Sequence, residues 1–254
     1  MATYGWPDVQ PLLVGGYDLV GDGTVTMELT IPGFTRVSEE ATGAGSTWEQ
    51  HKLTGEKKAK GPASLKVFYD DTAATGTKAA LTTQSSNRVF ILGYEGGAIG
   101  AGFAGGLGHA VDVDTPPSKG QLTKLVATLL LTGTYDPFGK ILKNVAAVTA
   151  DGNSQASSVD NAASSANGGA AYFAVKSLTL GTATDIILKV MHSTDNVSFA
   201  ALATATAVTA APAAEQVVVA AATTVNRYLA GLWDYSGTPN GATTATIFIG
   251  FARR

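Results

Sequence analysis

Runs in which apolar and polar residues alternate recur along the chain, separated by turn residues. The alternation is clearest at 24–31, at 64–69 and again at 185–192. Successive side chains of a strand point to opposite faces, so a period of two predicts strands with one buried face. Apolar runs bounded by turn residues predict further strands at 11–17, 88–94, 172–180, 216–222, 227–233 and 244–251. We therefore expect an all-β fold.

Two segments add to this expectation. The longest regular run covers 121–134, where Leu125, Ala127 and Leu129 occupy every second position. This spacing favours a long strand with one buried face, and the leucine content leaves a helix as the alternative. One short helix is predicted at about 73–84, after a run of Asp and Thr that can cap it, although glycine and threonine within it disfavour helix.

The remaining segments lack periodicity. Residues 35–62 are polar and contain glycines, which predicts a long exposed loop, and such loops are uncommon in compact domains unless they have a function. Residues 150–170 are rich in Ser, Asn, Gly and Ala, which predicts a linker. The expected organisation is therefore a β-barrel or β-sandwich domain over 1–149, the linker, and a small antiparallel β-sandwich over 171–254.

Composition limits the chemistry. The 254 residues include no cysteine and three histidines, and charged residues make up 15%, against roughly 25% in typical soluble proteins. The absence of cysteine excludes disulfides and thiolate metal sites and fits assembly in a reducing cytoplasm. A net charge of −3 disfavours specific nucleic-acid binding, and no apolar run is long enough for a membrane helix. We expect no cofactor and no enzymatic activity.

The histidines are the main candidates for a chemical site. His109 precedes Asp112 and Asp114, a spacing that could hold a metal, but no second ligand cluster accompanies it. His192 lies among Ser and Asp residues of a predicted turn, and no G-x-S-x-G motif is present for a hydrolase. His51 lies in the polar loop. A solvated loop residue is the favoured interpretation of His51, turn chemistry explains the surroundings of His192, and a metal site at His109 is disfavoured.

The order of motifs in residues 1–143 resembles the major tail proteins, or tail tube proteins, of long-tailed bacteriophages. The resemblance covers a little over half of the chain and is one of pattern. It is carried by an apolar strand and turn through 15–22, the alternating strand at 24–31, a glycine-containing loop at 42–55, the sequence Phe68-Tyr69-Asp70-Asp71, a short helix region, glycine-interrupted strands and a long closing strand at 122–134.

The resemblance implies a structural virion protein that self-assembles into rings, hexameric in this family, stacked as the tube through which DNA is delivered. It implies contacts with copies of itself, with tape-measure protein and with tail-terminator protein, and passage of DNA without specific binding. The protein would be made in the host cytoplasm and located in the virion tail. Residues 171–254 are similar to the extra β-domains that some tail proteins carry outside the tube.

The predicted loop supplies candidate inter-subunit contacts. Its apolar residues would gain nothing from exposure to solvent, which predicts that they contact a neighbouring subunit: Phe34, Val37, Trp48 and Leu53.

The alternative is a carbohydrate-binding or head-decoration β-sandwich on a virion surface. Its candidate sugar-stacking residues are Tyr228, Trp233 and Tyr235, with core packing as an equal alternative for Trp233. A hydrolase ranks last, because no catalytic site assembles from the sequence.

Overall fold

The computed structural model describes residues 10–20, 26–30, 34–40, 51–72, 76–82, 87–115 and 123–254. These residues form a nearly all-β fold with one short α-helix, which confirms the predicted fold class. The strands of the first part are β1 (Leu12–Val14), β2 (Tyr17–Asp18), β3 (Thr26–Thr30), β4 (Phe34–Glu40), β5 (His51–Ala59), β6 (Ala63–Phe68), β7 (Arg88–Gly93), β8 (Gly102–Asp114) and β9 (Lys124–Val148). The later strands are β10 (Gly152–Asn153), β11 (Val159–Asp160), β12 (Gly169–Thr179), β13 (Asp185–Ser193), β14 (Ala200–Thr204), β15 (Ala213–Val219), β16 (Tyr228–Ser236) and β17 (Thr244–Arg253). The helices are α1 (Thr77–Thr82) and the 3-10 turns η2 (Glu95–Gly97) and η3 (Gln155–Ser157).

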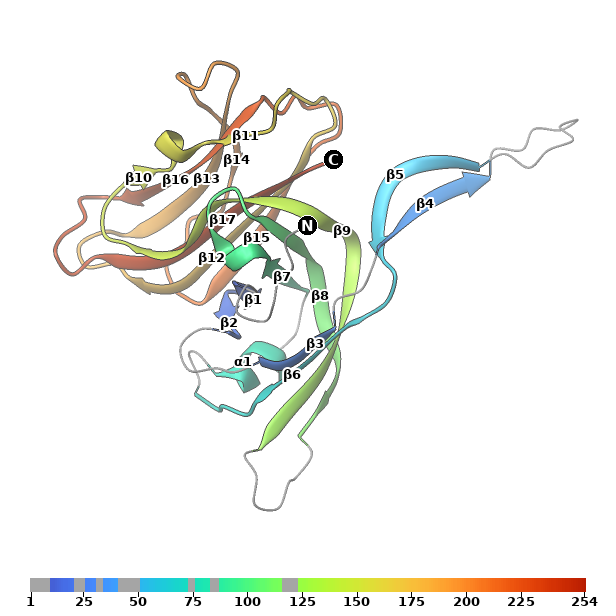
Figure 1. Ribbon diagram of the computed structural model, residues 1–254. Helices are drawn as coiled ribbons and strands as arrows, with labels where there is room; N and C mark the ends of the chain where they lie inside the picture. Colours follow the sequence, from blue (N-terminus) through green and yellow to red (C-terminus); the bar gives the residue numbers. More distant parts are fainter. Residues whose placement is uncertain are drawn as a thin grey trace, which may run out of the picture.

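The described strands form three antiparallel sheets (Figure 1). A ten-stranded sheet has the order β15-β12-β17-β9-β8-β7-β1-β2, with β6 beside β9 and β3 beside β6. A five-stranded sheet has the order β10-β16-β13-β14, with β11 also on β16. The third sheet is the β4–β5 hairpin alone. The two larger sheets pack against each other through apolar faces of β12, β13, β16 and β17.

The alternating segments became strands close to the predicted bounds. In β6 the burial alternates without interruption, with Ala63, Leu65 and Val67 inside. The described part of the segment predicted at 121–134 is a strand and not a helix, because β9 runs from Lys124 to Val148, 25 residues in all. Its second half keeps strand geometry because β17 pairs along it, from Ala245 opposite Val148 to Phe251 opposite Lys140.

The predicted division into two domains joined by a linker does not match this topology. β12 and β17 come from the last third of the chain, yet they lie in the same sheet as β9, β8 and β7. Residues 150–170 hold β10, η3, β11 and the start of β12, and β10 and β11 both pair with β16. The composition of small polar residues wrongly predicted a linker. Backbone pairing with β16 holds this segment in place, although its side chains bury little apolar surface.

One buried cluster is built from both halves of the chain. The rings of Phe103, Tyr172 and Phe248 meet edge to face, with centroids 5.3 Å apart for the Phe103–Tyr172 pair and 5.7 Å for the Phe103–Phe248 pair. All three side chains are fully buried. Edge-to-face contacts of this kind add to the stabilisation from apolar burial. The cluster therefore links β8 to β12 and β17.

Glycines make room for these rings. A Cβ atom placed on Gly105 would lie 2.6 Å from Cε1 and from Cζ of Tyr172, and one on Gly250 would lie 2.7 Å from Cε1 of Phe103. Gly139 also lies directly against the Phe103 ring. Gly105, Gly139 and Gly250 are thus explained by the close approach of aromatic rings to the backbone.

Gly105→Ala is expected to lower the free energy of unfolding by about 1–3 kcal/mol, as overpacking of a core does. Tyr172 cannot move aside easily, because its hydroxyl donates a 2.8 Å hydrogen bond to Asp136 and accepts a 2.6 Å bond from Gln216. The control is Gly241→Ala, where a Cβ would meet nothing within 4 Å. Chemical denaturation of both variants measures the difference, and equal stabilities would contradict the explanation.

A buried polar network attaches the last residue to β9. The carboxylate of Asp136 is 3% exposed, and Arg254 donates to its two oxygens at 3.3 and 3.2 Å. Burial, and next the neighbouring Asp136 carboxylate, raise the pKa of Tyr172 well above its ordinary value. Asp136 thus has both a cation and a hydroxyl donor, as a buried carboxylate requires.

Candidate inter-subunit arm

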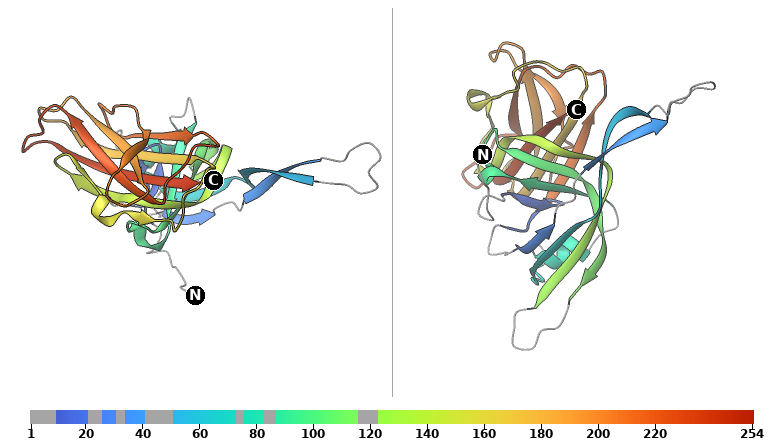
Figure 2. Two further views of the ribbon diagram at one scale, coloured as in Figure 1. Left: turned by 90° about the horizontal axis from the view of Figure 1, so that it is seen from above. Right: turned by 45° about the vertical axis from the view of Figure 1, so that its right-hand side comes forward.

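The described residues of the segment predicted as an exposed loop form two paired strands instead. β4 and β5 pair antiparallel, from Phe34 opposite Ala59 to Glu40 opposite His51. Among the described strands they pair only with each other, and the hairpin projects away from the body of the molecule (Figures 1 and 2). We call β4 and β5 the arm. Apolar and polar residues do not alternate in either strand, so the sequence has no period of two that would predict them.

The base of the arm contacts β9 through an aromatic pair. The ring of Phe34, the first residue of β4, meets the ring of Phe138 edge to face at 5.6 Å. Phe138 is 68% exposed, more than the other exposed aromatic residue of the described chain, Tyr69, at 36%. The base of the arm therefore presents aromatic surface to solvent beside a projecting strand pair.

The predicted contact residues are distributed along this arm. Phe34 lies at its base, Val37 lies in β4, and Leu53 lies in β5 opposite Ser38. Trp48 lies outside the described residues. Phe138 was not predicted from the sequence, because no local pattern there indicates that the ring of this strand residue is exposed.

The predicted sugar-stacking platform on β16 does not form. Tyr235 is 3% exposed, and its hydroxyl donates a 3.0 Å hydrogen bond to the carbonyl of Val148. Trp233 lies on the same face of the strand and packs against the core cluster there, and its Nε1 donates to the carbonyl of Ala150 at 3.0 Å. The Lys143 ammonium lies 5.1 Å from the centre of the Trp233 ring.

Tyr228 is separated from the other two by strand geometry. It is an odd number of residues from Trp233, so the two side chains point to opposite faces of β16. Its ring instead lies under the Arg227 guanidinium, at 4.9 Å. Period-two alternation could have shown this separation in advance.

The histidines and acids do not assemble into a chemical site within the described residues. His109 Nδ1 lies 3.0 Å from the Asn87 side-chain oxygen, and no group of three or more potential metal ligands occurs in this part of the chain. The Asn226 N–H donates to Nδ1 of His192 at 3.3 Å, and burial lowers the pKa of that imidazole. His51 lies in β5 of the arm.

A cavity of about 380 Å³ opens beside β12 and β15. Its lining is mostly apolar and includes Phe173, Leu188 and Val208. Glu215 is the one charged residue of that lining, and its carboxylate already accepts from the Thr206 N–H at 2.7 Å and from the Thr206 hydroxyl at 3.2 Å. The cavity therefore offers neither an acid–base pair nor a free charge for a polar ligand.

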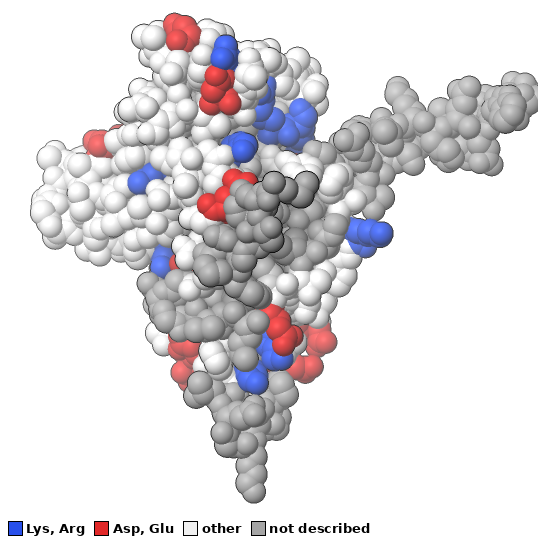
Figure 3. Space-filling view, viewed as in Figure 1, with Lys and Arg blue, Asp and Glu red and all other residues white. Residues whose placement is uncertain are grey.

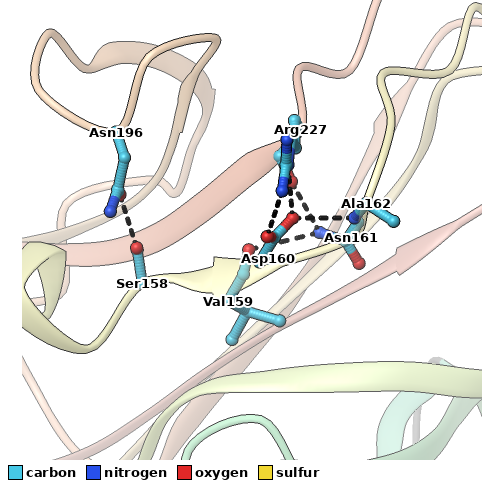
Figure 4. A network of polar contacts seen from close by, with 7 residues as sticks. All are labelled: Ser158, Val159, Asp160, Asn161, Ala162, Asn196 and Arg227. Carbon is cyan, nitrogen blue, oxygen red and sulfur yellow. Dashed lines mark hydrogen bonds and ion pairs between the residues drawn. The ribbon is translucent and has the colours of Figure 1, made fainter.

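Polar contacts hold residues 158–162 against the later strands (Figure 4). The Arg227 guanidinium donates to both oxygens of Asp160, at 2.7 Å from Nε and 2.6 Å from Nη2. The Ala162 N–H also donates to Asp160, at 2.7 Å, and the Ser158 hydroxyl donates to Asn196 at 2.5 Å. These contacts fix the segment that composition suggested was a linker.

Arg227→Gln is expected to raise the pKa of Asp160 from about 2 toward the ordinary value of about 3.9. The Arg227 hydrogen bonds are the main cause of the low pKa, followed by the Ala162 N–H. A carboxyl group whose pKa is lowered in the folded state stabilises the fold at any pH above its ordinary pKa. That contribution is lost as the pH falls toward 2. Carbon-13 NMR of the carboxyl groups measures the shift.

Asp195 serves as the internal control for this measurement. Its pKa is also about 2, but the cause is hydrogen bonds from the backbone N–H groups of Ser198 and Val197 and from the Ser193 hydroxyl. Arg227→Gln should leave it unchanged. Equal pKa changes at Asp160 and Asp195 would mean that the substitution alters the whole protein, and that loss of the Arg227–Asp160 ion pair is not the cause.

The visible surface is sparsely charged, with lysine, arginine and acidic side chains scattered over a mostly uncharged face (Figure 3). Within the described residues, no helix is both long and apolar enough to cross a membrane. No protein-family model matches the chain, and no curated protein matches it significantly. Within the described residues, the arm is the strand pair that belongs to neither of the two larger sheets.

Proposed function

We propose that this chain is a structural virion protein whose copies assemble into stacked rings that form a phage tail tube. The observation that carries the proposal is the arm, a strand pair that projects from the body and pairs with no other described strand. The order of motifs in the first 143 residues supports the same function.

The physical argument starts from the stability of such a hairpin. An isolated two-stranded hairpin is marginally stable in water, so an arm of this kind gains stability when it packs on another surface. The exposed Phe138 ring at its base adds apolar area that assembly can bury. With 15% charged residues, the chain also has the low charge that suits the buried core of an interface.

The proposal includes partners and location. The ring would be hexameric, as the resemblance implies, with tape-measure and tail-terminator proteins as further partners. DNA would pass through the lumen without specific binding, consistent with a net charge of −3. The assembled protein would lie in the virion tail.

No observation favours the carbohydrate-binding or head-decoration alternative. A sugar platform needs aromatic faces that are coplanar and open to solvent, whereas Tyr235 is buried and Tyr228 lies on the other face of β16 from Trp233.

Electron microscopy and sedimentation of the purified full chain test the proposal. We expect rings or tubes whose fraction increases with protein concentration. Dispersed monomers at all concentrations and salt conditions would contradict it, and sugar binding by those monomers would favour the alternative.

A further inference from the structure

We propose that Asp136 and Arg254 are positioning residues for the arm: their ion pair fixes a register shift in β9 that places the Phe138 ring outside, against Phe34. The inference deepens the proposed function and rests on it, since the arm is the contact surface of the proposed tube. It depends on three features of the structure: the register shift, the buried residues at its two ends, and the contact between Phe138 and the arm.

β9 has one extra residue where it passes the buried rings of β8 and β12. Gly105 of β8 lies opposite Asp136, and Phe103 lies opposite Gly139. Two steps along β8 therefore match three steps along β9, which is the pattern of a β-bulge. Phe138 lies within these three steps. Bulges change the direction in which a side chain points, and they are common beside functional sites.

The residues at the two ends of the shift face the same buried rings. The Asp136 carboxylate accepts the Tyr172 hydroxyl at 2.8 Å, and Gly139 lies directly against the Phe103 ring. Residues three apart in a regular strand point to opposite faces, so the extra residue is what lets both ends face inward. Phe138 is left outside and is 68% exposed. In a regular strand it would share the inner face with Asp136.

The ion pair fixes one end of the shift. Asp136 is 3% exposed, and the Arg254 guanidinium donates to both of its oxygens, at 3.3 Å from Nε and 3.2 Å from Nη2. Removing the cation from a buried carboxylate is strongly destabilising. Arg254 directly follows β17, so replacing its side chain leaves the backbone pairing of β17 in place. Loss of the cation therefore favours a register in which Asp136 reaches water, and a one-residue slip turns side chains to the other face.

The outward ring of Phe138 is the surface on which the base of the arm packs. Phe34, the first residue of β4, meets this ring edge to face at 5.6 Å. Aromatic pairs have a preferred geometry and add stability beyond burial of area. If Phe138 turned inward, the arm would lose this contact with β9. The placement of the arm therefore depends on the pair formed by Asp136 and Arg254.

Thiol reactivity tests the register, because the chain has no cysteine of its own. Phe138→Cys in the full chain should react rapidly with a water-soluble maleimide. Adding Arg254→Gln should slow this reaction about ten-fold or more, because breaking a buried ion pair costs more than the roughly 1.4 kcal/mol that a ten-fold change requires. The control is Val197→Cys, at a residue 79% exposed, whose rate Arg254→Gln should not change.

Cross-linking within one subunit tests the placement of the arm. The full chain with both Phe34→Cys and Phe138→Cys should be joined by a short bis-maleimide in dilute solution, where links between subunits are rare. Arg254→Gln should slow this cross-link about ten-fold or more, because the effective concentration of one thiol at the other falls when the two residues separate.

Tube formation gives the functional measurement. Arg254→Gln should abolish tubes, whereas Arg227→Gln should not, because the ion pair of Arg227 with Asp160 contains no residue of β9 or of the arm. Arg254→Lys keeps the cation but lacks the two-nitrogen fork, so it should restore tubes in part. Circular dichroism and thermal unfolding establish that each variant is folded. If Arg254→Gln does not fold, Arg254→Lys replaces it in both thiol measurements, with a smaller decrease expected.

The outcomes separate the two proposals. If the wild-type chain forms no tubes or rings, the proposed function fails, and the thiol measurements still decide whether the ion pair positions the arm. If tubes form but loss of the Arg254 guanidinium leaves both thiol rates unchanged, the inference is overturned and the proposed function stands. A lower unfolding midpoint with unchanged thiol rates and normal tubes would mean that Arg254 only stabilises the fold, which also overturns the inference.

Discussion

A chain that ends at Val148 is expected to be insoluble or unfolded. The truncation removes β17, which pairs with β9 along its second half, and β12 beyond it. It also removes Tyr172 and Phe248 from the faces of Phe103. Burial of one large apolar side chain stabilises a fold by about 1.5–3 kcal/mol, and whole domains are stable by only about 5–15 kcal/mol.

Expression, solubility and circular dichroism of the truncated chain measure this effect. The matched control keeps every strand and breaks only chain continuity, by inserting a protease site after Val197 in an exposed loop and cleaving it. The two fragments should stay associated and folded. A soluble truncated chain with a strand spectrum would show that residues 1–148 have a sufficient core, as two separate domains would require.

Replacing residues 36–57 with a short glycine-containing turn is expected to give a folded monomer that forms no tubes. The arm pairs with no other described strand, so the pairing within the two larger sheets should be unaffected. Assembly should be lost entirely, because the proposed contact surface is gone.

Thermal unfolding and sedimentation distinguish the two effects of this excision. The unfolding midpoint should stay near that of the full chain, while rings and tubes disappear from electron micrographs. The control is Val197→Ser, which changes an exposed apolar residue away from the arm and should assemble normally. Tubes formed by the excised variant would contradict the role of the arm.

The sequence by itself determined the strands whose burial is local. Alternation at 64–69 and at 185–192 predicts β6 and β13, because a strand with one buried face leaves a period of two in its own residues. The same rule separates Tyr228 from Trp233 on β16. The all-β class follows from this alternation. The short helix near 77–82 follows from another local signal, the Asp and Thr residues that can cap it.

Only the tertiary structure decided how the strands combine. Which strand lies beside β9 depends on residues about a hundred positions away, so no local pattern in 121–148 distinguishes a separate first domain from a sheet shared with β17. The arm escaped prediction for a related reason. Its two strands pair with each other and with no other described strand, and backbone pairing leaves no hydrophobic period in the sequence.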